Sequence, residues 1–111
     1  MPRRVIKRVL PVEDEPLGDY ELVLVFSPAI AEDGLDAAIE KVSQLITEGG
    51  GTPPVIEQWG KRKLAYTIKR FMEGNYVLTR FKLKPGLTRE LEANLHISEE
   101  ILRHLLIRST V

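Results

Sequence analysis

The stretch YELVLVF, Tyr20 to Phe26, is apolar at six of its seven positions and predicts a central β-strand that is covered on at least one face. Ser27 and Pro28 end this strand. Asp33 is a residue type that caps helices, and the glycine run at 49–51 is typical of a helix end. Between these two signals, four apolar residues recur at helical spacing and predict an amphipathic helix: Leu35, Ile39, Val42 and Ile46.

Two further extended segments follow the glycine run. In the first, residues 55–69, Gly60 indicates a bulge or a close backbone approach. The tripeptide Glu73-Gly74-Asn75 predicts the turn to the next strand, residues 76–84, which alternate with a period of two. The alternation sends one set inward: Val77, Thr79, Phe81 and Leu83. It turns the other set toward water or a polar partner: Tyr76, Leu78, Arg80, Lys82 and Lys84.

The last part of the chain predicts a short helix and a final strand. Thr88 is expected to cap the helix, which buries Leu91 and Leu95. The alternation within residues 101–109 divides them into two sets: Leu105 and Ile107 inward, and His104, Leu106 and Arg108 outward. The order strand, helix, strand, strand, helix, strand predicts an α+β, ferredoxin-like βαββαβ sandwich. This fold has four antiparallel strands and carries both helices on one face, so the other sheet face is uncovered.

The chain of 111 residues has the length of one domain, which we expect over residues 19–111. Residues 1–18 hold three prolines and an acidic cluster without periodicity, and they predict a flexible N-terminal extension. The chain has no Cys, and no apolar run reaches the roughly 18 residues of a membrane span. We therefore expect a soluble, cytoplasmic protein without a membrane partner.

Few residues point to catalysis or to a bound metal. The only histidines, His96 and His104, have neither metal-ligand spacing nor an interpretable nucleophile or acid partner. The glycine run follows a helix, and no Lys-Ser or Lys-Thr comes after it as in a phosphate-binding loop. We expect no catalytic residue, no metal and no cofactor.

The formal net charge is zero, but the charges are arranged in blocks. Residues 1–8 carry four basic residues and no acid, and residues 9–58 carry eleven acids and one base. Residues 59–89 then carry nine basic residues against one acid, Glu73. A basic block attracts polyanions even in a neutral protein, because exposed charges more than about 10 Å apart are screened at 0.1 M salt. The block is typical either of a nucleic-acid surface or of an edge strand that lysines keep soluble.

Two aromatic residues, Trp59 and Tyr66, bracket the basic triplet at residues 61–63. Aromatic rings interleaved with cations can stack on bases while the cations hold phosphates. The face that Tyr66 shares with Leu64 and Ile68 instead favours a core position for this tyrosine.

The segment WGKRKLAYTI, residues 59–68, resembles the signature of the bacterial small-subunit ribosomal protein S6 family. In that signature an aromatic residue or leucine, a glycine and two or three basic or polar residues precede Leu-Ala-Tyr. Three flanking pieces agree in order: Tyr20-Glu21, Tyr76-Val77-Leu78 and Ile101-Leu102-Arg103. The resemblance covers about residues 19–110.

The resemblance implies a non-enzymatic subunit of the ribosomal platform, with the ferredoxin-like fold and without a small-molecule substrate. Its implied partners are the small-subunit (16S) ribosomal RNA and ribosomal protein S18. The motif positions that it assigns to RNA contact are Lys61, Arg62, Lys63 and Arg103, together with Tyr20. Independently, the periodicity makes Leu78 and Leu106 candidates for a partner-binding surface on the uncovered sheet face.

Two other functional classes stay open. A small-molecule sensor of the same fold would need a polar pocket at a subunit interface. A small hydrolase would need clustered titratable groups in a cleft.

Overall fold

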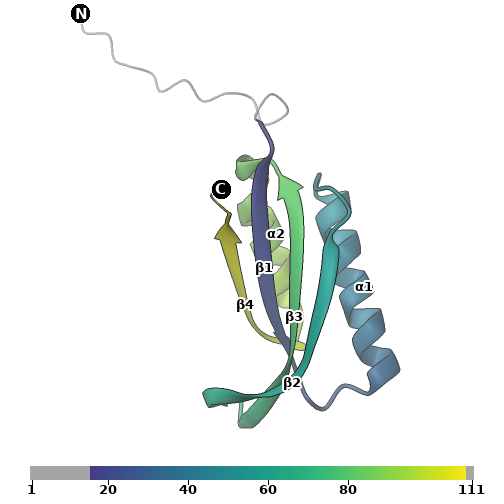
Figure 1. The fold of residues 1–111 in the computed structure, drawn as a ribbon, viewed down its shortest axis with the longest axis vertical. Helices are drawn as coiled ribbons and strands as arrows, with labels where there is room; N and C mark the ends of the chain where they lie inside the picture. The colour runs from purple at the N-terminus through teal and green to yellow at the C-terminus, as the bar shows by residue number, and fades with distance from the viewer. Residues whose placement is uncertain (1–15, 110–111) are drawn as a thin grey trace, which may run out of the picture.

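The computed structural model describes residues 16–109 and folds them in the predicted order (Figure 1). Most of the expected N-terminal extension, residues 1–15, and residues 110–111 lie outside the described residues. Gly18, assigned to the extension, is the first residue of the sheet. The elements are β1 (Gly18–Phe26), α1 (Glu32–Glu48), β2 (Val55–Ile68), β3 (Phe71–Leu83), the short 3-10 helix η2 (Pro85–Leu87), α2 (Thr88–Ile97) and β4 (Ile101–Arg108).

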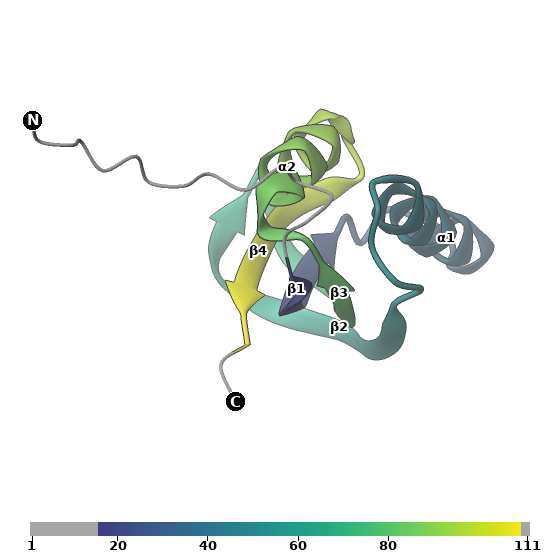
Figure 2. The same cartoon turned by 90° about the horizontal axis from the view of Figure 1, so that it is seen from above.

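The four strands form one sheet in the order β2-β3-β1-β4, and every neighbouring pair is antiparallel. Both helices lie on the same face of this sheet, as the view from above shows (Figure 2). The predicted ferredoxin-like α+β fold is therefore confirmed. Among residues 16–109, no helix is long and apolar enough to cross a membrane.

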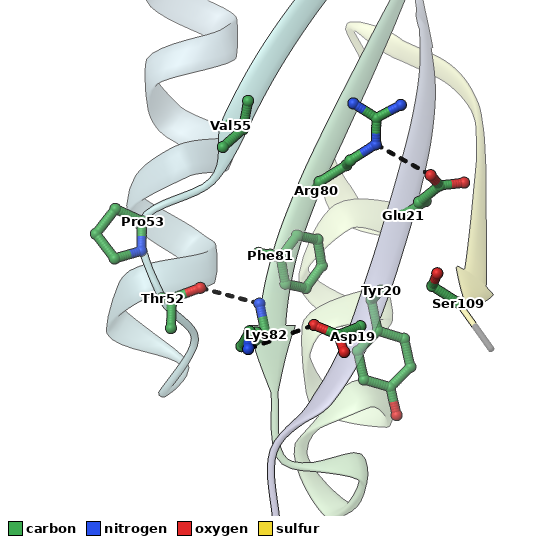
Figure 3. Close-up of a pocket in the computed structure, with 10 residues that line it drawn as sticks. All are labelled: Asp19, Tyr20, Glu21, Thr52, Pro53, Val55, Arg80, Phe81, Lys82 and Ser109. Atoms are coloured by element: carbon green, nitrogen blue, oxygen red, sulfur yellow. Dashed lines mark hydrogen bonds and ion pairs between the residues drawn. The ribbon is translucent and has the colours of Figure 1, made fainter. Parts of the chain in front are cut away.

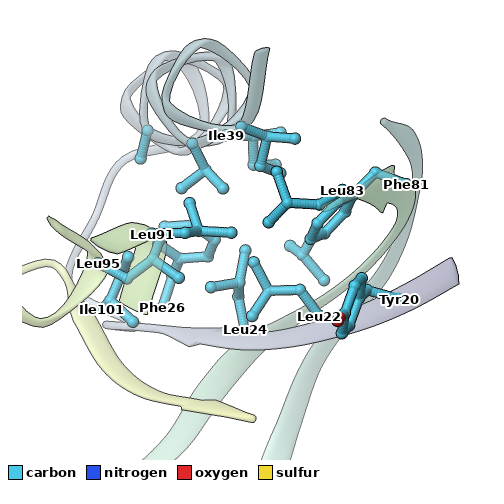
Figure 4. Packing of buried hydrophobic residues seen from close by; sticks show 14 residues of the cluster. Tyr20, Leu22, Leu24, Phe26, Ile39, Phe81, Leu83, Leu91, Leu95 and Ile101 are labelled. Carbon is cyan, nitrogen blue, oxygen red and sulfur yellow. The ribbon is translucent and has the colours of Figure 1, made fainter. Parts of the chain in front are cut away.

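The core lies between the helices and the sheet face that they cover (Figure 4). The predicted inward set of β3 is buried, because it alternates toward the helices as the period of two requires. From the helices, the buried residues sit at the spacing of one helical face: Ala38, Ile39, Val42, Ile46, Leu91 and Leu95. β1 supplies the other wall with Tyr20, Leu22, Leu24 and Phe26.

A β-bulge at Leu102 interrupts the pairing of β4 with β1. Ile101 lies opposite Phe26 and Arg103 lies opposite Val25, so Leu102 has no residue opposite it. Both Ile101 and Leu102 are buried. An extra residue in one strand places each later residue of that strand on the opposite face of the sheet from the one that regular alternation predicts.

The inward and outward assignment within β4 was consequently wrong. Leu106 lies opposite the core residue Leu22 and packs against the core from the helix side. Leu105 and Ile107 lie on the open face of the sheet, where they are 49% and 43% exposed. Paired residues share a face, so the outward set is in fact on the helix side: His104, Leu106 and Arg108.

The predicted turn at Glu73-Gly74-Asn75 was also wrong, because these residues are part of β3. The chain turns at Lys69 and Arg70, a two-residue hairpin loop with positive φ values of 49° and 73°. Gly74 has a packing role instead. A Cβ at this position would lie 2.4 Å from Cγ1 of Val25, so the glycine lets β1 and β3 approach closely.

The glycine run ends α1 as predicted, with Gly49 at the C-cap and Gly50 at φ 101°. The two predicted caps were wrong. Asp33 lies inside the first turn of α1, where its Oδ1 accepts a hydrogen bond from the Gly34 amide. Thr88 is the first residue of α2, and its hydroxyl donates to the Pro85 carbonyl.

Candidate nucleic-acid interface

The β2–β3 hairpin extends beyond the rest of the sheet. β1 pairs with β3 only as far as Asn75. β2 and β3 stay paired to Lys63 opposite Glu73 and, after a register shift, pair again at Ile68 opposite Phe71 beside the turn. We call residues 61–74 the hairpin arm. A bulge at Trp59, followed by Gly60 at φ 83°, stands where the arm begins. Bulges bend a strand and increase its twist, and the arm curves away under the sheet in Figure 1.

The hairpin arm is strongly basic, with five basic residues and one acid, Glu73. The expected RNA-contact residues Lys61, Arg62 and Lys63 are all exposed on it. The guanidinium carbon of Arg62 lies 5.6 Å from the ring centroid of Trp59. This cation–π contact holds Arg62 over an aromatic surface without neutralising its charge.

Arg103, the fourth expected RNA-contact cation, lies on the same side of the sheet as Arg62. Arg103 is opposite Val25 in β1, and Arg62 is opposite Gly74 in β3, so both belong to the face that the helices leave open. Nη1 of Arg103 donates a 2.7 Å hydrogen bond to the hydroxyl of Tyr66. The structure thus brings the arm and β4 together, although they occupy distant parts of the sequence.

Tyr66 does not have the core position that its strand face favoured. Its side chain is 62% exposed, because the hairpin arm extends past the layer that would bury it. Sequence reasoning missed the contact between Tyr66 and Arg103, since the curvature of the arm leaves no periodic signal.

The four candidate cations lack acidic partners among residues 16–109, unlike Arg80 and Lys82. Within residues 16–109, none of Lys61, Arg62, Lys63 and Arg103 forms an ion pair. Arg80, in contrast, contacts Glu21 at 3.1 Å and Glu57 at 3.8 Å, and Lys82 contacts Asp19 at 3.8 Å. The charges toward the far end of the open face are balanced, and those at its arm end remain available.

Tyr20 is not part of this exposed surface, contrary to expectation. It is 7% exposed, and its ring stacks on Phe81 with 6.2 Å between the centroids. The guanidinium of Arg108 covers the ring at 5.9 Å. The strand alternation that makes Leu22 and Leu24 inward also turns Tyr20 inward, so its burial follows from the pattern.

Neither of the two residues expected to bind a partner is exposed on the open face. Leu78 lies on the open face as expected, but it is only 5% exposed, between Glu57 and Val23 in register. Leu106 lies on the other face, as the bulge in β4 dictates. Three apolar side chains that do reach solvent on the open face were not expected there from the sequence: Val55, Leu105 and Ile107.

A hollow of about 450 Å³ lies at the far end of the sheet, between the start of β2 and the end of β4 (Figure 3). Its charged lining residues pair with one another: Arg80 with Glu21 and Lys82 with Asp19. Paired charges leave little to orient a small ligand, which gives no support to the sensor alternative. Within residues 16–109, no group of three or more His, Cys, Asp or Glu residues is placed to hold a metal ion.

Comparison with known proteins agrees with the sequence resemblance. The sequence model for the family described as Ribosomal protein S6 matches residues 19–108. Small ribosomal subunit protein bS6 of Moorella thermoacetica is 41% identical over 90 residues, covering 81% of this chain and 92% of that protein. The protein of the same name from Dehalococcoides mccartyi is 42% identical over 93 residues, covering 84% and 85%.

A solved structure points the same way. The crystal structure of the 30S ribosomal protein S6 from Thermotoga maritima matches with a TM-score of 0.80 at 30% identity, covering 85% of this chain and 89% of that one. This family comprises structural, non-enzymatic components of the small ribosomal subunit. The predicted family and the predicted lack of enzymatic activity are confirmed: the chain belongs to the ribosomal protein S6 family.

Proposed function

We propose that this small-subunit protein binds 16S ribosomal RNA in the platform region, together with ribosomal protein S18, and supports subunit assembly in the cytoplasm. The RNA-binding residues are Lys61, Arg62 and Lys63 of the hairpin arm and Arg103 of β4. One observation carries the proposal: these exposed cations lack acidic partners within residues 16–109, whereas those beside Glu21 and Asp19 are paired.

Binding by such a surface is mainly phosphate neutralisation and fit to the shape of the RNA. A double-helical RNA hides its major-groove base edges, so a protein meets chiefly phosphates and 2′-hydroxyls. A guanidinium can bind a phosphate through two hydrogen bonds, whereas an ammonium acts as a point charge. Arg62 and Arg103 therefore contribute more individually than Lys61 or Lys63. Arg103 gives one N–H to Tyr66 and keeps other donors for a phosphate.

The open face of the sheet is the proposed contact surface for S18. Leu105 and Ile107 of β4 and Val55 of β2 expose apolar side chains there. Exposed apolar groups on a sheet face that no helix covers are typical of a protein contact. This surface replaces the pair Leu78, which is buried, and Leu106, which is half-buried on the helix side of the sheet.

The proposal is tested by a filter-binding titration of the protein, together with S18, on 16S RNA over a range of salt concentrations. We expect Arg62→Gln and Arg103→Gln each to weaken binding and to lower the salt slope by about one unit, because each removes one phosphate contact. Their thermal unfolding should stay nearly unchanged, since both side chains are exposed.

Arg89→Gln is the matched control, because Arg89 is an exposed arginine on α2, on the helix side of the molecule. It removes the same charge and should leave both the affinity and the salt slope unchanged. A salt slope near zero for the unmodified protein, or equal losses in Arg62→Gln and Arg89→Gln, would argue against the proposed RNA surface.

A further inference from the structure

The part of β2 that carries Tyr66 is irregular. The register of β2 against β3 shifts within the hairpin arm, so four residues of β2, 64–67, stand where β3 has only Met72. Surplus residues interrupt the ladder of a strand pair and redirect side chains, often beside functional sites. Tyr66 lies in this segment, and its hydroxyl reaches Arg103 of β4, which lies beyond β3 and β1 in the order of the sheet.

The aromatic ring of Tyr66 is not covered by another ring or by a cation. Arg103 contacts the hydroxyl, at the edge of the ring. Among residues 16–109, no other ring stacks on Tyr66, and no guanidinium or ammonium group lies over it. Trp59 and Tyr20, in contrast, each have an arginine guanidinium over the ring. Tyr66 is also 62% exposed, so it offers an aromatic surface to a ligand.

Arg103 places a positive charge beside this ring. Its guanidinium has five N–H donors, and one of them is directed at Tyr66. No carboxylate of residues 16–109 pairs with it. The 2.7 Å hydrogen bond between the two side chains therefore holds a stacking surface next to a group that can bind phosphate.

We propose that Tyr66 and Arg103 together bind one unpaired nucleotide of the RNA. The base stacks on the ring of Tyr66, and the guanidinium of Arg103 donates to the phosphate of the same nucleotide. A base inside a double helix is stacked on its neighbours, so the ligand is a nucleotide of a loop, a bulge or an end. Stacking tolerates any base, because every base has an aromatic face. The inference rests on the proposed RNA binding, to which it adds Tyr66 and the class of nucleotide.

The test separates the ring of Tyr66 from its hydroxyl. The protein is titrated, together with S18, on a 16S RNA fragment and on a fully paired RNA duplex of equal length. Tyr66→Leu should weaken binding to the 16S fragment by about tenfold, the usual effect of losing one stacked base. Its salt slope should not change, because no charge is removed. Tyr66→Phe keeps the ring and should stay within about threefold of the original affinity.

Two controls accompany these variants. Met72→Ala removes another exposed side chain of the hairpin arm without removing an aromatic ring, and it should leave the affinity unchanged. Binding of Tyr66→Leu to the duplex should equal that of the original protein, because the duplex has no unpaired base to stack within its length. Binding of S18 without RNA should also be the same for Tyr66→Leu and the original protein.

Four results would overturn the nucleotide site: no loss in Tyr66→Leu, equal losses in Tyr66→Leu and Tyr66→Phe, an equal loss in Met72→Ala, or an equal loss on the duplex. A weaker affinity of Tyr66→Leu for S18 alone would assign the ring to the protein contact and would overturn the site as well. None of these results removes the salt-dependent binding of the original protein or the loss expected in Arg62→Gln. A failure of this site is therefore distinguishable from a failure of the proposed RNA surface.

Discussion

Replacing Gly74 with alanine should destabilise the protein by crowding the contact between β1 and β3. The added Cβ would lie 2.4 Å from Cγ1 of Val25 and 3.3 Å from the carbonyl oxygen of Phe26. The first distance is about 1 Å shorter than ordinary carbon–carbon contact. Gly74 is not among the glycines with positive φ, so the effect is steric and not a backbone preference.

The magnitude follows from the two neighbours. Forcing an extra methyl group into a packed site typically costs about 1–3 kcal/mol. The Phe26 carbonyl belongs to the central strand and moves little, which places Gly74→Ala at about 2–3 kcal/mol. For a domain of this size, that loss corresponds to a fall in Tm of roughly 10–20 °C. Urea unfolding followed by circular dichroism measures it.

A double-mutant cycle with Val25→Ala identifies the cause. Val25→Ala removes the atom that the new Cβ would meet. The stability loss of the double variant should therefore be smaller than the sum of the two single losses by at least about 1 kcal/mol. Gly60→Ala is the contrast, because a Cβ there meets nothing within 4 Å and is unfavourable only through φ 83°. A Gly74→Ala variant as stable as the original protein, or a cycle without coupling, would refute the reasoning.

Three further variants test two other structural findings. The double change Lys69→Asn with Arg70→Gly should raise the free energy of unfolding by about 1 kcal/mol in urea, because both residues then suit the positive φ values of the turn. An unchanged or lower stability would show that the positive φ values of Lys69 and Arg70 do not destabilise the turn. Leu106→Ala should lower stability by about 2 kcal/mol, and Leu105→Ala by less than about 1 kcal/mol, as thermal unfolding would show. The opposite ranking would contradict the face reversal at the Leu102 bulge.

The order of elements could be predicted from the sequence because the hydrophobic pattern of each element recurs over several residues. Residues 20–26 and 76–84 alternate or run apolar over their whole length, and α1 shows four apolar residues at helical spacing. The reversal in β4, in contrast, depends on the single extra residue Leu102. The two adjacent apolar residues at 101–102 are the one local sequence feature that indicates a bulge. The feature is ambiguous, because a regular strand can also begin with two apolar residues.

The sequence predicted which basic residues belong to the candidate site, but it did not predict how they are arranged in space. The basic triplet at 61–63 is visible as a charge block. The neighbours of Tyr66 and Lys69 depend on where the hairpin arm curves, which is set by the bulge before it and by the two-residue turn at its end. Gly74 was misread as a turn signal because a glycine required for close packing and a glycine required for positive φ look identical in a sequence.

The central place of β1 has a consequence for incomplete chains. Its two neighbours, β3 and β4, both come from later parts of the sequence, so its hydrogen bonds all depend on distant segments, a topology associated with slow folding. A fragment cut between α2 and β4, whether by proteolysis or by premature termination of synthesis, would leave one edge of β1 unpaired. That edge belongs to an apolar strand and could recruit strands from other molecules. A strand that has a neighbour on each side in the intact protein would then become an aggregation hazard.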